Sequence, residues 1–221
     1  MKKNKFFRLA LFLIFALFCT QNIFSQTAKT ALNKFYAARS LESQGKVAEA
    51  KQSYSEIVRI CKDEISRNVT PSENYVVLGW TLIRLERYND AIRICQEGLK
   101  IAPTEYRHNE TMGEAYFYLN RYNESIKMFE TYLGALPNGV HSATALFFLG
   151  EIYRLTSKFE HSDIAYSAAL RKEPSIPLWW YRLGRTREAA GKNKEALEAY
   201  QKALKLRPSF SDAQEAINRL S

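Results

Sequence analysis

Two residue types recur with one spacing over most of this 221-residue sequence, and that spacing constrains the fold more than any other feature. Four prolines are separated by 34, 37 and 34 residues: Pro103, Pro137, Pro174 and Pro208. Four glycines keep the same 34, 37 and 34 spacing: Gly79, Gly113, Gly150 and Gly184. Because a fixed period of this length is typical of stacked supersecondary units, the sequence predicts a repeat architecture.

The residues around each glycine follow the same period. An apolar residue precedes every glycine: Leu78, Met112, Leu149 and Leu183. A small residue follows twelve positions after it: Ala91, Ser125, Ser162 and Ala196. A larger residue follows four positions later: Cys95, Phe129, Tyr166 and Tyr200. This pattern predicts two antiparallel helices in each unit, since small residues let the helix backbones approach and proline ends the second helix.

Two units carry the clearest motifs: Leu149-Gly150-x2-Tyr153 and Trp180-x2-Leu183-Gly184. The pattern resembles the tetratricopeptide repeat, which reads W-x2-L-G-x2-Y, then A-x3-F and then P over 34 residues. A weaker first copy has Lys62 where the proline is expected and retains Ala38, Leu41, Gly45, Ala50 and Tyr54. The resemblance covers residues 31–208. It implies an all-α fold, a right-handed α-solenoid of about five helix-turn-helix units.

We expect one repeat domain over residues 26–221, with repeats at about 31–64, 72–105, 106–139, 143–176 and 177–210. The expected helix pairs are 29–44 with 47–66, 72–86 with 88–101, 106–119 with 122–135, 142–156 with 159–172, and 177–190 with 193–206. A capping helix is expected at 209–220, because repeat arrays need a terminal unit with a polar outer face.

Residues 1–25 have the three parts of a secretory signal peptide: a basic start, an apolar run, and a small residue, Ser25, at the expected cleavage point. An uncleaved membrane anchor is one alternative, although the apolar run is shorter than the roughly 20 residues that span a bilayer. Lipid modification of Cys19 is another, although the large Phe18 precedes it. We therefore expect an exported, periplasmic protein of bacterial type, which associates with the membrane only if the leader is retained or Cys19 is lipidated.

The net charge of +9 includes four basic residues of the leader, so the remaining chain carries only a mild basic excess. These basic residues are interleaved with glutamates, and we expect no nucleic-acid partner. Cys61 and Cys95 are expected to be buried free thiols, since they fall at different heights on neighbouring helices and a disulfide needs Cα atoms within about 7 Å.

The sequence contains no recognised catalytic motif, such as a glycine-rich phosphate loop, H-E-x-x-H or G-x-S-x-G. Its histidines, His108, His141 and His161, fall in different repeats, whereas a metal site needs several converging ligands. We therefore predict a chain with no catalytic residues, no cofactor and no metal.

The resemblance implies a concave groove lined by the first helix of each pair. The candidate partner-binding residues are Arg39, Trp80, Arg84, Phe117, Tyr118, Phe147, Arg154, Tyr181 and Arg185. Aromatic residues and arginine are enriched at binding hot spots. We expect Trp80, Phe117 and Arg185 to be exposed, whereas Tyr36 and Phe148 could either face the groove or pack between repeats.

Some members of the family clamp a peptide carboxylate with polar residues on successive first helices, but apolar residues such as Val76 and Trp80 occupy several of those positions here. We expect instead a partner with apolar anchors and some acidic groups. The predicted function is that of a non-catalytic scaffold or adaptor in the cell envelope, which binds a peptide or protein segment in the groove. The alternative is a small-ligand or transporter-accessory binding protein with an apolar pocket among Trp80, Phe117 and Phe147.

Overall fold

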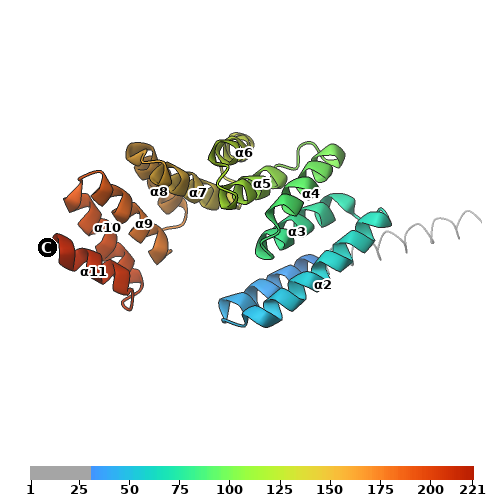
Figure 1. Cartoon of the computed structure of the whole chain (residues 1–221), viewed down its shortest axis with the longest axis horizontal. Coiled ribbons are helices and arrows are strands. Elements are labelled where there is room, and N and C mark those ends of the chain that lie inside the picture. Colours follow the sequence, from blue (N-terminus) through green and yellow to red (C-terminus); the bar gives the residue numbers. More distant parts are fainter. Residues whose placement is uncertain (1–30) are drawn as a thin grey trace, which may run out of the picture. The chain divides into compact units, whose positions relative to one another are not determined.

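The computed structural model describes residues 31–221, so the predicted signal peptide and Cys19 lie outside the described residues. Every regular element in the described range is an α-helix (Figure 1). Residues 31–43 are helical. The helices that follow are α2 (Val47–Ser66), α3 (Pro71–Arg84), α4 (Tyr88–Ile101), α5 (Arg107–Tyr118), α6 (Tyr122–Ala135), α7 (Ser142–Leu155), α8 (Phe159–Lys172), α9 (Pro177–Ala189), α10 (Asn193–Leu206) and α11 (Ser211–Leu220).

The described helices lie close to the ranges that the sequence predicts. Helices α3 and α4, α7 and α8, and α9 and α10 pack against each other as pairs, and α11 packs on α10 as the expected capping helix. The described residues form two compact units, one that ends at Thr111 and one that begins at Met112. The boundary between the units therefore lies within α5.

The repeated glycine lies where two helices of a pair touch. A Cβ atom on Gly150 would lie 2.7 Å from the ring of Tyr166, and one on Gly184 would lie 2.6 Å from the ring of Tyr200. The small residue twelve positions later has a second role in two repeats, because its hydroxyl group donates to the carbonyl of the glycine. Ser125 bonds to Gly113 at 2.7 Å and Ser162 to Gly150 at 2.9 Å. The period thus marks the contact that holds each helix pair together.

The turn within each described pair uses the left-handed backbone region, a feature that the sequence analysis did not identify. A residue with positive φ follows the first helix in five places: Gly45, Glu86, Asn120, Ser157 and Gly191. The next residue donates its backbone N–H to a carbonyl five residues earlier, as Lys158 does to Tyr153 at 2.8 Å. This is the bond of a Schellman motif, which ends the helix and reverses the chain.

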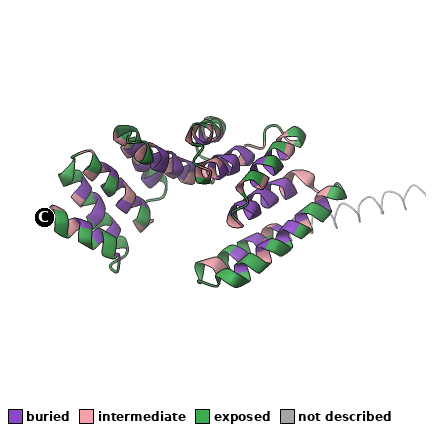
Figure 2. Cartoon of the chain, in the orientation of Figure 1, coloured by how far each residue is buried: buried purple, intermediate pink, exposed green. Residues whose placement is uncertain are grey.

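Every described helix contains buried residues (Figure 2). Four tyrosines on second helices are among the largest fully buried residues: Tyr54, Tyr132, Tyr166 and Tyr200. The capping helix covers its side of the core with Ala213 and Ala216, which lie in one cluster with Tyr200 and Phe210.

Both cysteines in the described range are buried free thiols, as predicted. Burial, with Glu64 nearby, raises the pKa of the Cys61 thiol to about 12, and burial likewise raises the pKa of Cys95. Within residues 31–221, no helix has the length and apolar character needed to cross a membrane.

Candidate partner-binding surface

The structure places the predicted residues of the first unit at different depths. Arg39 is exposed, Arg84 is half-buried, and Trp80 is only 9% exposed. The expectation that Trp80 is exposed is therefore wrong. Its ring lies 5.6 Å from that of Phe35, and the guanidinium of Arg107 lies 5.8 Å from its centroid. Trp80 therefore joins the core of this unit.

The aromatic candidates of α5 and α7 divide between packing and exposure. Phe147 stacks on Trp179 with centroids 5.0 Å apart, so it packs between repeats. Phe117 is half-buried, with its ring 5.0 Å from that of Phe148, which is itself buried. Tyr118 is 43% exposed. In the first unit Tyr36, for which the sequence left two readings open, is 58% exposed.

The candidates of α9 lie next to each other, one buried and one exposed. Tyr181 is 9% exposed and packs on Tyr200 and Phe210, with ring centroids 5.6 and 5.1 Å away. Arg185 lies one helical turn later, and its Nη1 atom is 3.5 Å from the Tyr181 hydroxyl. Arg185 is exposed, as the sequence predicts.

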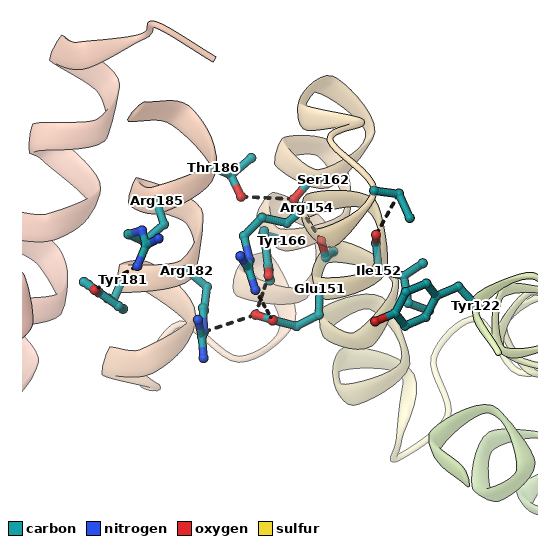
Figure 3. A network of polar contacts seen from close by, with 12 residues as sticks. Tyr122, Glu151, Ile152, Arg154, Ser162, Tyr166, Tyr181, Arg182, Arg185 and Thr186 are labelled. Carbon is teal, nitrogen blue, oxygen red and sulfur yellow. Dashed lines mark hydrogen bonds and ion pairs between the residues drawn. The ribbon is translucent and has the colours of Figure 1, made fainter. Parts of the chain in front are cut away.

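The last candidate, Arg154, belongs to a polar cluster around a buried carboxylate (Figure 3). Glu151 on α7, whose side chain is 8% exposed, accepts a hydrogen bond from Arg154 at 2.8 Å. The hydroxyl of Tyr166 on α8 donates to the other oxygen of the same carboxylate. Arg182 on α9 places its Nε atom 3.2 Å from that oxygen. One carboxylate therefore connects both helices of one pair with the first helix of the next pair.

The same arrangement occurs twice more, and we refer to the three as Tyr–Glu–Arg triads. In the first unit Glu42 accepts from the hydroxyl of Tyr54 at 3.1 Å and from Arg84 at 2.6 Å. In the second unit Glu188 on α9 accepts from the Tyr200 hydroxyl at 2.6 Å and from Arg219 at 2.9 Å. In each triad the tyrosine comes from the second helix of the same pair, and the arginine from the next pair or the capping helix.

In the first and last triads the charges favour an ionised glutamate beside a neutral tyrosine. Burial opposes ionisation of Glu42, but hydrogen bonds from Arg84 and Tyr54 outweigh it and lower its pKa. The pKa of Glu188 is lowered in the same way, against burial, by Tyr200 and Arg219. Burial and then the Glu42 charge raise the pKa of Tyr54 to about 12.

Three of the nine predicted binding residues are thus arginines that contact a triad glutamate. Arg84 and Arg154 are hydrogen-bonded to triad glutamates, and Arg39 lies 3.7 Å from Glu42. The triads were not predicted from the sequence. A signal was present in the first and last, where a glutamate precedes the repeat tyrosine by twelve residues, as in Glu42 and Tyr54.

Family models described as the tetratricopeptide repeat match residues 33–61, 72–105 and 177–210. These three segments are tetratricopeptide repeats. The crystal structure of MamA resembles it with a TM-score of 0.62 at 18% identity, over 79% of this chain and 96% of that chain. A thermophilic repeat protein of Thermus thermophilus, TTC0263, has a TM-score of 0.63 at 18% identity, over 86% and 98%. At these identities the likeness establishes the fold, and the predicted all-α solenoid of tetratricopeptide repeats is confirmed.

Two further relatives have names that refer to binding. YrrB, described as a tetratricopeptide-repeat protein with an unusual peptide-binding site, has a TM-score of 0.57 at 16% identity, over 85% of this chain and 92% of that chain. The peroxisomal targeting signal receptor of Candida glabrata is 36% identical over 62 residues, and that of Saccharomyces cerevisiae matches equally well. The matched segment is 28% of this chain and 10% of the receptor, so the likeness is confined to a small part of each receptor.

The second unit of this repeat chain has a pocket between α9 and α11, with a volume of about 760 Å³. Its lining residues are Tyr181, Arg185, Glu188, Ala189, Asp212, Glu215 and Arg219. The ion pair of Glu188 with Arg219 joins the two helices that form its walls. Of the predicted binding residues, Tyr181 and Arg185 therefore share one recess.

Within residues 31–221, no three His, Cys, Asp or Glu side chains are grouped so that they could hold a metal ion. His108 is fully buried against Gly98, and burial lowers its pKa to about 4. Tetratricopeptide repeats generally serve as scaffolds for protein or peptide partners, since a stack of repeats presents an extended binding surface.

Proposed function

We propose that this chain is a non-catalytic scaffold that binds a segment of another protein through exposed residues of its first helices. The observation that carries the proposal is the exposure that remains on these helices after core packing and the triads are accounted for. Tyr36 and Tyr118 are 58% and 43% exposed, and Arg185 is exposed. Tyrosine and arginine provide apolar contact area together with hydrogen bonds, and they recur at binding hot spots.

The names of the relatives support a peptide partner. YrrB is described as having a peptide-binding site, and the peroxisomal receptors are named for a targeting signal. By analogy, an extended segment or a protruding helix is the form of partner that we propose here. The exposed tyrosines would contact its apolar side chains.

The proposed setting is the bacterial cell envelope, with another envelope protein as the partner. This part of the proposal rests on the signal-like residues 1–25. The chain would be periplasmic after cleavage, and attached to a membrane if the leader is retained or Cys19 carries a lipid.

The small-ligand alternative requires an apolar pocket lined by Trp80, Phe117 and Phe147, but these rings pack on other side chains. Trp80 packs on Phe35, Phe147 on Trp179, and Phe117 on Phe148. Each of these rings is therefore used for contacts within its own unit.

Affinity purification after cross-linking in the native envelope tests the scaffold proposal. The wild-type chain should recover a reproducible set of envelope proteins. The variant Tyr36→Ala/Tyr118→Ala should lose them, whereas Ile164→Ala, at a 69% exposed position on the second helix α8, should retain them. Equal recovery by all three chains would contradict binding on the first helices. Release of a lipid or small molecule from the purified protein, without a protein partner, would support the alternative.

A further inference from the structure

The pocket between α9 and α11 has one pair of charges that neutralise each other. Arg219 bonds to both oxygens of Glu188, at 2.9 and 3.0 Å from its Nη2 atom. Glu188 also accepts a hydrogen bond from the Tyr200 hydroxyl at 2.6 Å, which holds this carboxylate in place. This ion pair joins α11 to α9. Because its two charges neutralise each other, it offers little net charge to a ligand.

Three other charged residues of the pocket have no ion-pair partner among residues 31–221. Arg185 contacts the Tyr181 hydroxyl at 3.5 Å, and its charge acts on Glu188 only from a distance, where it helps to lower the pKa. Asp212 accepts a hydrogen bond from its neighbour Ser211 at 3.2 Å. The third is Glu215. All three residues are exposed, so solvent stabilises their charges when the pocket is empty.

These charges are separated by sign. The cation, Arg185, lies on the α9 wall, and the two carboxylates, Asp212 and Glu215, lie on the α11 wall. A partner with charges of one sign would satisfy one wall and be repelled by the other. A partner that presents both signs can satisfy both walls, and such complementarity governs specificity more than affinity.

We propose that this pocket binds a partner segment that carries a basic residue next to an acidic residue. The basic side chain faces Asp212 and Glu215, and the acidic side chain faces Arg185. Tyr181, which is nearly buried beside Arg185, provides an apolar contact for the stem of the entering side chain. This inference rests on the proposed function, because it specifies the chemistry of the segment that the first helices bind.

Selection of displayed random 12-residue peptides on the full chain tests the inference. Peptides enriched by the wild-type chain should contain two residues of opposite charge that are neighbours in the sequence or on one face of a helix. Arg185→Glu makes the pocket acidic and should shift the enriched peptides to paired basic residues. Asp212→Asn/Glu215→Lys makes it basic and should shift them to acidic residues. The enriched wild-type peptide should bind about fivefold more weakly to either variant, as expected for the loss of a partly exposed ion pair.

Matched controls are available on the second helix α8, where Arg171 and Glu160 are exposed. Arg171→Glu and Glu160→Lys reverse single charges in the same two directions and should leave the selected peptides unchanged. Thermal unfolding of all variants checks that the fold is intact.

The outcomes separate this inference from the proposed function. Enriched peptides without a charge pattern, or with one that the controls shift equally, would overturn the pocket assignment and leave the scaffold proposal intact. If free lysine or glutamate competed as well as the peptide, the ligand would be a small zwitterion instead, and the inference would be wrong. Enrichment of no peptide would contradict both this inference and binding of an extended segment. The cross-linking experiment would then show whether the chain binds a folded protein instead of an extended segment.

Discussion

Glu151 and Arg182 form an ion pair, 3.2 Å between the Oε1 and Nε atoms, that joins two successive helix pairs across the α7–α9 contact. The same carboxylate holds Arg154 and Tyr166, so three donors depend on one buried group. With the equivalent contacts at Glu42 and Glu188, polar triads as well as apolar packing join successive helix pairs or the capping helix.

The first prediction concerns this carboxylate. Glu151→Gln removes the charge and leaves Arg154, Arg182 and Tyr166 with weaker or missing bonds inside the unit. Because breaking a buried charged network leaves its partners uncompensated, we expect the free energy of unfolding to fall by about 2–4 kcal/mol. Urea denaturation measures this. The exposed Glu160→Gln should change it by about 0.5 kcal/mol or less, and equal effects in the two variants would contradict a stabilising role for the triad.

The second prediction concerns Gly150. Gly150→Ala places a Cβ atom 2.7 Å from the ring of Tyr166, which its bond to Glu151 prevents from moving away. We expect a loss of about 1–3 kcal/mol in unfolding free energy. Gly134→Ala is the matched control, because no atom lies within 4 Å of the new Cβ, and it should stabilise α6 by about 0.5–1 kcal/mol. A neutral Gly150→Ala would show that the helices of the pair can separate without cost.

The third prediction concerns the left-handed turn residue Ser157, which has φ +58°. Glycine adopts this conformation without steric cost. Ser157→Gly should therefore raise the free energy of unfolding by about 0.5–1 kcal/mol, and with it the melting temperature. At Gly191, with φ +73°, the substitution to alanine should lower the free energy of unfolding by a similar amount. The same sign of change at both positions would contradict this explanation of the turns.

The fourth prediction is a pH dependence of stability that originates at His108. Burial lowers its pKa from the ordinary 6.5 to about 4, with Glu105 opposing and Arg107 reinforcing the shift and Glu73 acting like Glu105. Between these values the unfolded chain binds a proton that the folded chain does not. His108 therefore contributes up to about 3 kcal/mol to the free energy of unfolding. This contribution is complete above pH 6.5 and is lost as the pH falls to about 4.

Denaturation of His108→Gln over the same pH range provides the measurement. Its stability should vary less between pH 6.5 and about 4 than that of the wild type, whereas exposed His161→Gln should retain the wild-type slope. Below this window Glu42 and Glu188 contribute as well. The pKa of Glu42 is lowered in the folded state, so its contribution is lost as the pH falls below the ordinary value of 4.5. An unchanged slope in His108→Gln would assign the pH dependence to other groups.

The fold could be predicted from the sequence because two physical requirements recur at fixed positions. Glycine is needed where Tyr166 and Tyr200 contact the first helix, and proline follows each second helix from α4 onwards. The binding face was harder to predict. Trp80 occupies a first-helix position but packs on Phe35, which belongs to the preceding and weakest repeat. The burial of Trp80 therefore depends on a contact from the first repeat, which matches the repeat pattern least well.

The triads escaped prediction for a related reason. Glu151 directly follows its repeat glycine, whereas Glu188 lies four residues after Gly184, so the two glutamates do not share a position in the repeat. Their arginine partners lie on the next helix pair or on the capping helix, at a separation of 31 residues for both Arg182 and Arg219. Such contacts are found only once the helices are placed in space.

Site-specific photo-cross-linking in living cells tests the central claim most directly. A photoreactive amino acid would replace Tyr118 on the first helix α5 or Ile164 on the second helix α8, both of which are exposed. We predict that the probe at position 118 captures a defined protein and that the probe at position 164 does not. Capture of the same protein from both positions, or from position 164 alone, would contradict the proposal that the first helices form the binding face.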